Sequence, residues 1–202
     1  MKIKANENKV LSTKEKEKII KKLEKHFHRI LVDMNFDIEN DQQIKNTPKR
    51  ISKMWVNELF NGCYDEPPKI TVFDNENNCK DIVFVGPISL KSTCSHHFVP
   101  FIGHAYIAYI PDKKIIGVSK LARIVKWFMR RPQIQEELTK QIADYIEENL
   151  IPSGVAVYLE AQHLCMTVRG VEEYESYMKT SSVRGAFEDI ATRQEFFNMI
   201  LR

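Results

Sequence analysis

The sequence has no long apolar run. None of its 202 residues lies in a stretch approaching the roughly 18 consecutive apolar side chains that a membrane-spanning helix needs. The first ten residues, MKIKANENKV, contain no apolar core of the kind that a secretory signal requires. We therefore expect a protein of the cytoplasm without a membrane partner.

A large excess of charge of one sign is also missing. The chain carries 30 basic and 27 acidic side chains, which leaves a formal net charge of +3. Proteins that bind the phosphate backbone of nucleic acids are usually far more one-sided. Nucleic acid is therefore not an expected partner. The hydrophobic fraction of 43% provides enough apolar material for one domain with a sizeable core.

Cysteine is scarce, with four residues in the whole chain. Four are too few for a disulfide scaffold at this length, and a reducing compartment would leave them available to bind metal. Cys63 and Cys79 have no histidine close to them in the sequence, so we interpret them as inert thiols. Cys94 and Cys165 each have histidine neighbours and are candidates for chemistry.

The N-terminal third predicts two helices. Residues 1–12 are polar and aperiodic, and we expect a mobile tail there. Ser12 and Glu15 have the spacing of a capping box at the start of an amphipathic pattern. A second helix is expected to begin at Thr47, followed by proline in its first turn, and to stop before Gly62. We assign residues 13–64 to an N-terminal helical segment.

The rest of the chain, residues 65–202, predicts an antiparallel sheet with helices. A loop is expected at 65–80, strands at 81–90, 98–110 and 155–162, and helices at 119–129, 134–151 and 187–201, the first of them capped by Ser119. This order indicates an α+β domain with helices on one face of the sheet. The other face would need cover, which oligomerisation can supply.

Two short motifs combine thiols with imidazoles. Cys94 and His97 lie three positions apart at the expected entrance to a strand, and Cys165 follows the end of a later strand. Together they form a soft ligand set suited to Zn²⁺, and three protein ligands leave a fourth position for water. His96 and His163 would then be proton carriers beside the metal. The alternative is that both cysteines are small core residues.

Two polar segments are candidates for contact with a substrate. Ser119, Lys120 and Arg123 open a predicted helix, where free N–H groups favour an anion such as phosphate. They also fit a capping serine followed by a solvated basic face. Gln135 and Glu136 could hydrogen-bond the edge of a flat heterocycle, although polar residues at a helix start are usually just exposed.

Four segments in this order, CSHHFVPFIGHAYIAYIP, IGVSKLARIV, RPQIQEELTKQIA and QHLCMTVRG, closely resemble the zinc-dependent GTP cyclohydrolase I family. The resemblance covers the chain from about Thr47 to the end and includes NTPKRISKMW and KTSSVRGAF. It implies the tunnelling fold (T-fold), in which antiparallel sheets of several subunits join side by side into a barrel. It also implies a homodecamer with active sites between subunits, and a catalytic domain at residues 65–202.

The resemblance implies a role for each candidate residue. One Zn²⁺ per subunit would be held by Cys94, His97 and Cys165. The triphosphate would be bound by Ser119, Lys120, Arg123 and Arg169, with Arg50 reaching a neighbouring subunit's site, and the guanine would be read by Gln135 and Glu136.

The implied reaction converts GTP and water into 7,8-dihydroneopterin triphosphate and formate. A zinc-activated water would attack C8 of the purine while His163 supplies a proton to N7. His96 would then assist opening of the ribose, with Ser119 as a proton shuttle. The resemblance does not say whether the product leads to folate or tetrahydrobiopterin, or whether a regulatory protein binds.

One position departs from the family pattern, because Ser95 stands where the family usually has an acidic residue. A hydroxyl can hydrogen-bond there but adds no negative charge. Two alternatives remain open at this point. One is another tunnelling-fold enzyme that acts on a pterin or deazaguanine, and the other is a non-catalytic module in which a fourth protein ligand closes the zinc site.

Overall fold

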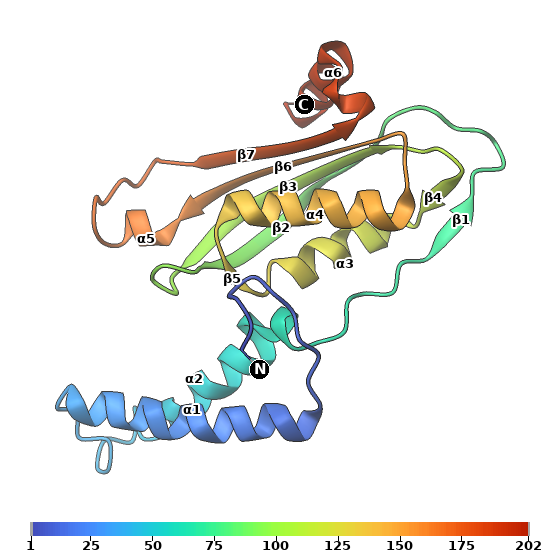
Figure 1. The fold of residues 1–202 in the computed structure, drawn as a ribbon. Helices are drawn as coiled ribbons and strands as arrows, with labels where there is room; N and C mark the ends of the chain where they lie inside the picture. The colour runs from blue at the N-terminus through green and yellow to red at the C-terminus, as the bar shows by residue number, and fades with distance from the viewer. Residues whose placement is uncertain (1, 202) are drawn as a thin grey trace. The chain divides into compact units, whose positions relative to one another are not determined.

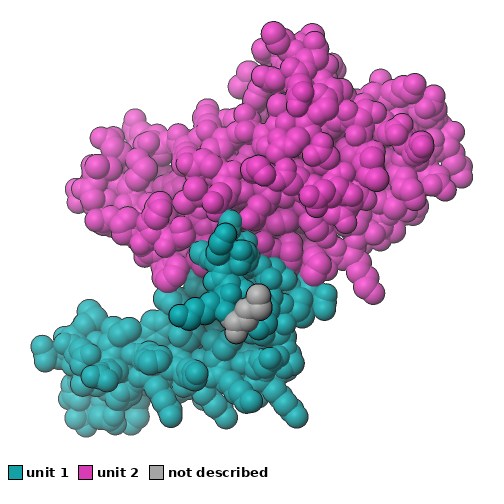
Figure 2. All heavy atoms as spheres, in the orientation of Figure 1, with its two compact units in different colours: residues 1–66 teal, residues 67–202 magenta. Residues whose placement is uncertain are grey.

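The computed structural model describes residues 2–201 and divides the chain into two compact units, Met1–Glu66 and Pro67–Arg202. Figure 1 follows the chain through both units, and Figure 2 colours them separately. Among the described residues, no helix combines the length and the apolarity that crossing a membrane would require.

The first unit is helical, as predicted. Helix α1 (Thr13–Asp33) begins with the expected capping box, in which the Ser12 hydroxyl accepts from the Glu15 N–H and the Glu15 carboxylate accepts from the Ser12 N–H. Helix α2 (Thr47–Met54) continues as a π-helical turn (Trp55–Leu59) and a 3₁₀ turn (Asn61–Cys63). None of the residues of α1 is fully buried within this chain.

The segment predicted as a mobile tail is hydrogen-bonded to the end of the first unit. The Lys9 N–H donates to the Cys63 carbonyl at 2.7 Å, and the Leu11 N–H donates to the Tyr64 carbonyl at 2.9 Å. These backbone hydrogen bonds restrict the conformational freedom of residues 9–11, so this part of the segment is not a mobile tail.

The second unit contains a five-stranded sheet in the order β5-β2-β3-β6-β7. Its strands are β2 (Val83–Cys94), β3 (Pro100–Ile110), β5 (Pro132–Gln133), β6 (Gly154–His163) and β7 (Met178–Gly185). All neighbours pair antiparallel except β5, which runs parallel to the end of β2. Short strands β1 (Val72–Asp74) and β4 (Lys114–Ile116) form a separate pair, so the predicted loop at 65–80 contains a strand.

Helices α3 (Val118–Phe128) and α4 (Gln135–Leu150) cover one face of the sheet, where the main core lies (Figure 1). Phe101 and Leu159 from the strands pack in this core with Leu121 and Ile142 from the helices, all fully buried. The prediction of an α+β fold with helices on one face of an antiparallel sheet is confirmed.

The opposite face of the sheet has its own, smaller cover near one end. Helix α6 (Ile190–Ile200) and the 3₁₀ turn Ala186–Glu188 place Phe196 and Phe187 in a second cluster with Ala108 and Ala156. Because side chains alternate between the two faces of a strand, these alanines point away from α3 and α4.

Two local predictions need correction. The N-cap of α3 is Gly117 and not Ser119, which lies one residue inside the helix. Strand β2 extends to Cys94 and does not end at Leu90, so the thiol belongs to the end of one strand as well as to the approach to the next. The turn formed by residues 95–97 then leads to β3.

Candidate metal centre and active site

The sheet brings the two cysteine-histidine motifs together at one of its ends. Strand β2 ends at Cys94 and β6 ends at His163, while β3 lies between them and pairs Phe101 with His163. Cys165 follows in the short helix α5 (Leu164–Thr167). The strand register therefore determines the meeting of segments that are far apart in the sequence.

One ligand atom from each of Cys94, His97 and Cys165 lies within 4.8 Å of the others. Burial raises the pKa of the Cys165 thiol, and the neighbouring sulfur of Cys94 raises it further. A divalent cation would reverse this preference, because thiolates are the metal-binding form and binding releases their protons. Two sulfurs and one imidazole therefore fit a thiophilic metal such as zinc, with one position of a tetrahedral ion left for a water or substrate.

His163 is held beside this group by neighbours on two sides. Its ring stacks on Phe101 with centroids 4.7 Å apart and planes 5° from parallel. Its Nε2 lies 2.9 Å from Oε1 of Gln135, at the start of α4. Burial lowers the pKa of His163, and the negative charge of Glu136 opposes this only in part. A neutral imidazole is ready to accept a proton at neutral pH.

Two further predicted residues lie at the same place. His96 Nδ1 is 3.8 Å from Cys94 Sγ, and Arg169 Nη1 is 3.1 Å from His97 Nε2. Both side chains are exposed and therefore accessible to a ligand. The residues of this site line a cavity of about 390 Å³, which we call the cysteine-histidine pocket: Cys94, His96, His97, Ile134, Gln135, Glu136, His163, Cys165, Met166, Arg169, Gly170, Val171 and Met178.

Of the predicted phosphate-binding residues, Arg169 lines this pocket, whereas Ser119, Lys120 and Arg123 do not line it within the described chain. Gln133 in β5 pairs with Cys94, and α3 ends shortly before β5. Because α3 has 11 residues, its N-terminal turn with Ser119 and Lys120 lies about 16 Å from its C-terminal end. Arg123 is exposed on the same helix, and the exposed Arg50 belongs to the first unit.

Sequence reasoning missed three residues that support His163. These are Phe101, which stacks on its ring, and Thr139 and Thr180, which hydrogen-bond around Gln135. A phenylalanine in a strand and a threonine in a helix give no functional signal in a sequence, since both are ordinary packing residues. The half-buried Ser95, where an acid was expected, donates its backbone N–H to the Gln133 carbonyl at 3.1 Å.

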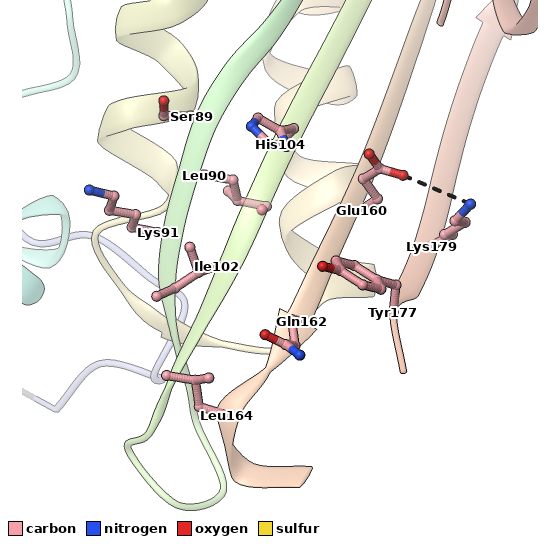
Figure 3. Close-up of a pocket in the computed structure, with 11 residues that line it drawn as sticks. Ser89, Leu90, Lys91, Ile102, His104, Glu160, Gln162, Leu164, Tyr177 and Lys179 are labelled. Atoms are coloured by element: carbon pink, nitrogen blue, oxygen red, sulfur yellow. Dashed lines mark ion pairs between the residues drawn. The ribbon is translucent and has the colours of Figure 1, made fainter. Parts of the chain in front are cut away.

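A larger cavity of about 650 Å³ lies on the sheet face opposite α3 and α4 (Figure 3). We call it the sheet-face hollow; its lining residues include Ser89, Lys91, His104, Glu160 and Lys179. Glu160 and Lys179 approach to 3.9 Å across the β6-β7 pair. None of the predicted site residues lines this hollow.

The fold and this site define an α+β domain, with an antiparallel sheet backed by helices and a group of two thiols and one imidazole at one end that could hold a metal ion. A family model for GTP cyclohydrolase I matches residues 23–201. The chain therefore belongs to the GTP cyclohydrolase I family.

Curated relatives agree with this assignment. Proteins named GTP cyclohydrolase 1 from Blochmanniella pennsylvanica and a Sulfurihydrogenibium species are 40% and 48% identical to this chain. These matches cover 90% and 80% of the chain and 82% and 84% of the relatives. Among solved structures, the archaeosine synthase QueF-Like in its apo form aligns over 52% of this chain and 94% of its own, with a TM-score of 0.42 and 15% identity.

Proposed function

We propose that this chain is a zinc-dependent GTP cyclohydrolase that converts GTP and water into 7,8-dihydroneopterin triphosphate and formate. One observation carries the proposal: in a chain of this family, three side chains that could hold a metal ion share a pocket with His163, whose pKa is lowered by burial. The reaction cleaves C–N bonds of a cyclic amidine, which requires an activated water and a proton donor for the departing nitrogen.

In this proposal Cys94, His97 and Cys165 hold one zinc ion per subunit. When bound, zinc supplies Lewis-acid activation of a water close to neutral pH. The ligands come from a strand end, the turn after it and a short helix beyond a second strand, all anchored to the same sheet. Anchoring of this kind would hold the three ligand side chains, and with them a bound ion, at a fixed place in the pocket.

His163 is the proposed proton carrier for the purine ring. Because its pKa is lowered, the neutral ring accepts a proton and then delivers it to N7 as the bond to C8 breaks. A second round of hydration at C8 releases formate. His96, which is exposed at the pocket rim, is proposed to assist the later opening of the ribose.

Glu136 and Arg169 are the proposed substrate contacts from this chain. Glu136 is exposed at the second position of α4, where its carboxylate can accept hydrogen bonds from the guanine edge. Arg169 can pair with phosphate oxygens through its planar guanidinium. Gln135 was expected to act with Glu136, but its side chain is fully buried and already bonded within the protein.

The remaining phosphate contacts are proposed to come from a second subunit. Ser119, Lys120 and Arg123 lie on α3 and do not line the cysteine-histidine pocket of their own chain. A neighbouring copy would therefore supply them, together with Arg50, and Ser119 could also relay a proton. This arrangement makes the active site dependent on assembly.

The sheet supports the proposed homodecamer, in which subunits join into a barrel. Strand β7 is an edge strand of the described sheet, and on its outer side β2 is paired by β5 only at Thr93 and Cys94. Unpaired edges readily take up a strand from another copy, and a closed ring removes both edges at once. We also propose a cytoplasmic location, consistent with four cysteines that form no disulfide in the described chain.

The test is to incubate the purified, metal-analysed oligomer with GTP and to measure formate together with the fluorescence of the oxidised pterin. We expect both products, lost on chelation and restored by zinc. Formate without pterin would mean that ring opening occurs and rearrangement fails. Neither product from a zinc-loaded oligomer would overturn the proposal in favour of a zinc-binding module without catalysis.

A further inference from the structure

Gln135 is the first residue of α4, and its side chain has no solvent-exposed surface. Its Nε2 lies 3.2 Å from the Leu159 carbonyl, 3.0 Å from the Met178 carbonyl and 3.1 Å from Thr180 Oγ1. Its Oε1 lies 2.9 Å from His163 Nε2. The amide therefore connects α4 with strands β6 and β7 and with one imidazole.

Two threonine hydroxyls determine which way this amide faces. Thr139 Oγ1 lies 2.7 Å from the backbone carbonyl oxygen of Gln135. The hydroxyl must be the donor in this bond, because a carbonyl oxygen only accepts. The 2.6 Å contact between Thr139 and Thr180 must then be a donation from the Thr180 hydroxyl, since the Thr139 proton is already used. Thr180 Oγ1 is left as an acceptor for the Gln135 amide.

All three atoms around one end of the amide are therefore acceptors. Two are backbone carbonyls, and the third is Thr180 Oγ1. A flipped amide would turn its oxygen toward these acceptors, and a buried acceptor without a donor is costly. The –NH₂ group must point to them, and Oε1 must point to His163.

We infer that Gln135 is a positioning residue that fixes the orientation of the His163 ring and keeps its proton on Nε2, leaving the Nδ1 lone pair for proton transfer. The inference rests on the proposed function for the reaction that His163 serves. The stacked ring of Phe101 limits tilting, while the hydrogen bond to Gln135 limits rotation in the ring plane. A single tautomer matters because only the nitrogen with a lone pair can accept a proton.

This role differs from the guanine contact expected from the sequence. Both amide hydrogens of Gln135 are directed to protein acceptors, and its oxygen has a donor in His163. The neighbouring Glu136 is exposed and available to a purine edge. Reading of the base therefore falls to Glu136, and placement of the proton carrier falls to Gln135.

The first experiment measures the tautomer directly. Zinc-loaded oligomer with ¹⁵N-labelled histidine is studied by solid-state NMR in mildly alkaline buffer, and a His163→Asn sample assigns the His163 signals by their loss. We expect wild-type protein to carry the His163 proton on Nε2. Gln135→Met removes the acceptor and should give a mixture of tautomers, whereas Gln162→Met, next to His163 in β6, leaves the acceptor in place and should keep the Nε2–H form. A wild-type ring protonated on Nδ1, or an unchanged ring in Gln135→Met, overturns the inference.

The second experiment separates positioning from base reading. For Gln135→Met we expect kcat for GTP to fall about 10- to 100-fold, the loss found when residues that orient a metal-ligating histidine are replaced. The Kd for GTP and the preference for GTP over inosine triphosphate, which lacks the 2-amino group, should stay unchanged. A weaker Kd with lost base preference would instead make Gln135 a reader of guanine. Gln162→Met, which removes the amide next to His163 in β6, is the matched control and should change neither value.

The two experiments also distinguish this inference from the proposed function. If wild-type protein produces no formate from GTP but shows the Nε2–H tautomer, the proposed function fails and the hydrogen-bond assignment stands. If formate is produced but the tautomer is wrong, the inference fails and the proposed function stands.

Discussion

The sheet-face hollow is larger than the cysteine-histidine pocket, but the pocket has the more ordered arrangement of functional groups. The hollow is the larger cavity, at about 650 Å³ against about 390 Å³. Its ion pair between Glu160 and Lys179 spans 3.9 Å on partly exposed side chains. In the pocket, His163 is fixed by a stacked ring and a buried amide beside two thiols.

This difference shows that an active site is better indicated by functional groups fixed close together than by the volume of a cavity. An exposed ion pair contributes only about 0.2–1 kcal/mol and leaves its side chains free to move. Groups whose neighbours fix them keep one geometry without reorganising during a reaction. Matched substitutions in the two regions can test the comparison.

The largest effect is expected for Cys165→Ser, which removes a proposed zinc ligand. We expect zinc content to fall and GTP turnover to drop by more than about 100-fold, since loss of a residue that only supports a ligand can cost 10- to 100-fold. Elemental analysis and the formate assay check both values. Cys79→Ser is the control, and equal loss of zinc in that variant would contradict the assigned ligand set.

A matched pair of carboxylates gives the next effect. Glu136→Gln should lower kcat/KM for GTP by about 10- to 100-fold, because hydrogen bonds to a charged group contribute about 1.5–3 kcal/mol. Glu160→Gln in the sheet-face hollow should stay close to wild type. Steady-state kinetics on both variants decide the comparison, and the reverse ranking would move the substrate to the hollow.

Removal of a cationic side chain from each region should have a smaller effect, measured as the Kd for GTP. Arg169→Met should raise the Kd for GTP about tenfold, since it removes one paired contact with phosphate. Lys179→Met should leave the Kd unchanged, although it breaks the ion pair with Glu160. Titration calorimetry at two salt concentrations measures both, and a comparable loss in Lys179→Met would show that the hollow takes part in anion binding.

The smallest expected effect is a change in the pKa of Tyr158, which lies on the same face of the sheet as the sheet-face hollow. Burial, the charge of Glu160 and the hydrogen bond to that carboxylate raise the pKa of Tyr158 to about 12. Since this pKa is raised on folding from 10.0, the stabilisation is intact below pH 10 and is lost as the pH rises toward 12.

Glu160→Gln should lower the pKa of Tyr158 toward its ordinary value without affecting turnover. Phenolate absorbance during an alkaline titration follows this change, and Tyr158→Phe identifies the signal. An unchanged titration in Glu160→Gln would leave burial and the neighbouring Tyr106 as the causes of the raised pKa.

Much of the fold follows from local patterns. The capping box of Ser12 and Glu15 is confirmed because both partners lie within one helical turn. The expected order of helices and antiparallel strands is also confirmed. The small strands β1, β4 and β5 were not predicted, since two or three residues give too little periodicity. We predicted Ser119 as the N-cap of α3, but the N-cap is Gly117. Glycine has no side chain that could cap the helix, so the sequence did not indicate this position.

The sequence by itself determined the kinds of chemistry available: two thiols and an imidazole for a metal, with a basic helix start and polar residues at the head of α4. The tertiary structure decided how these groups are used. Strand register placed Phe101 against His163, and hydroxyls from α4 and β7 turned Gln135 away from the substrate. The direction of a hydrogen bond depends on partners from distant segments of the chain, so it cannot be predicted from the local spacing of residues.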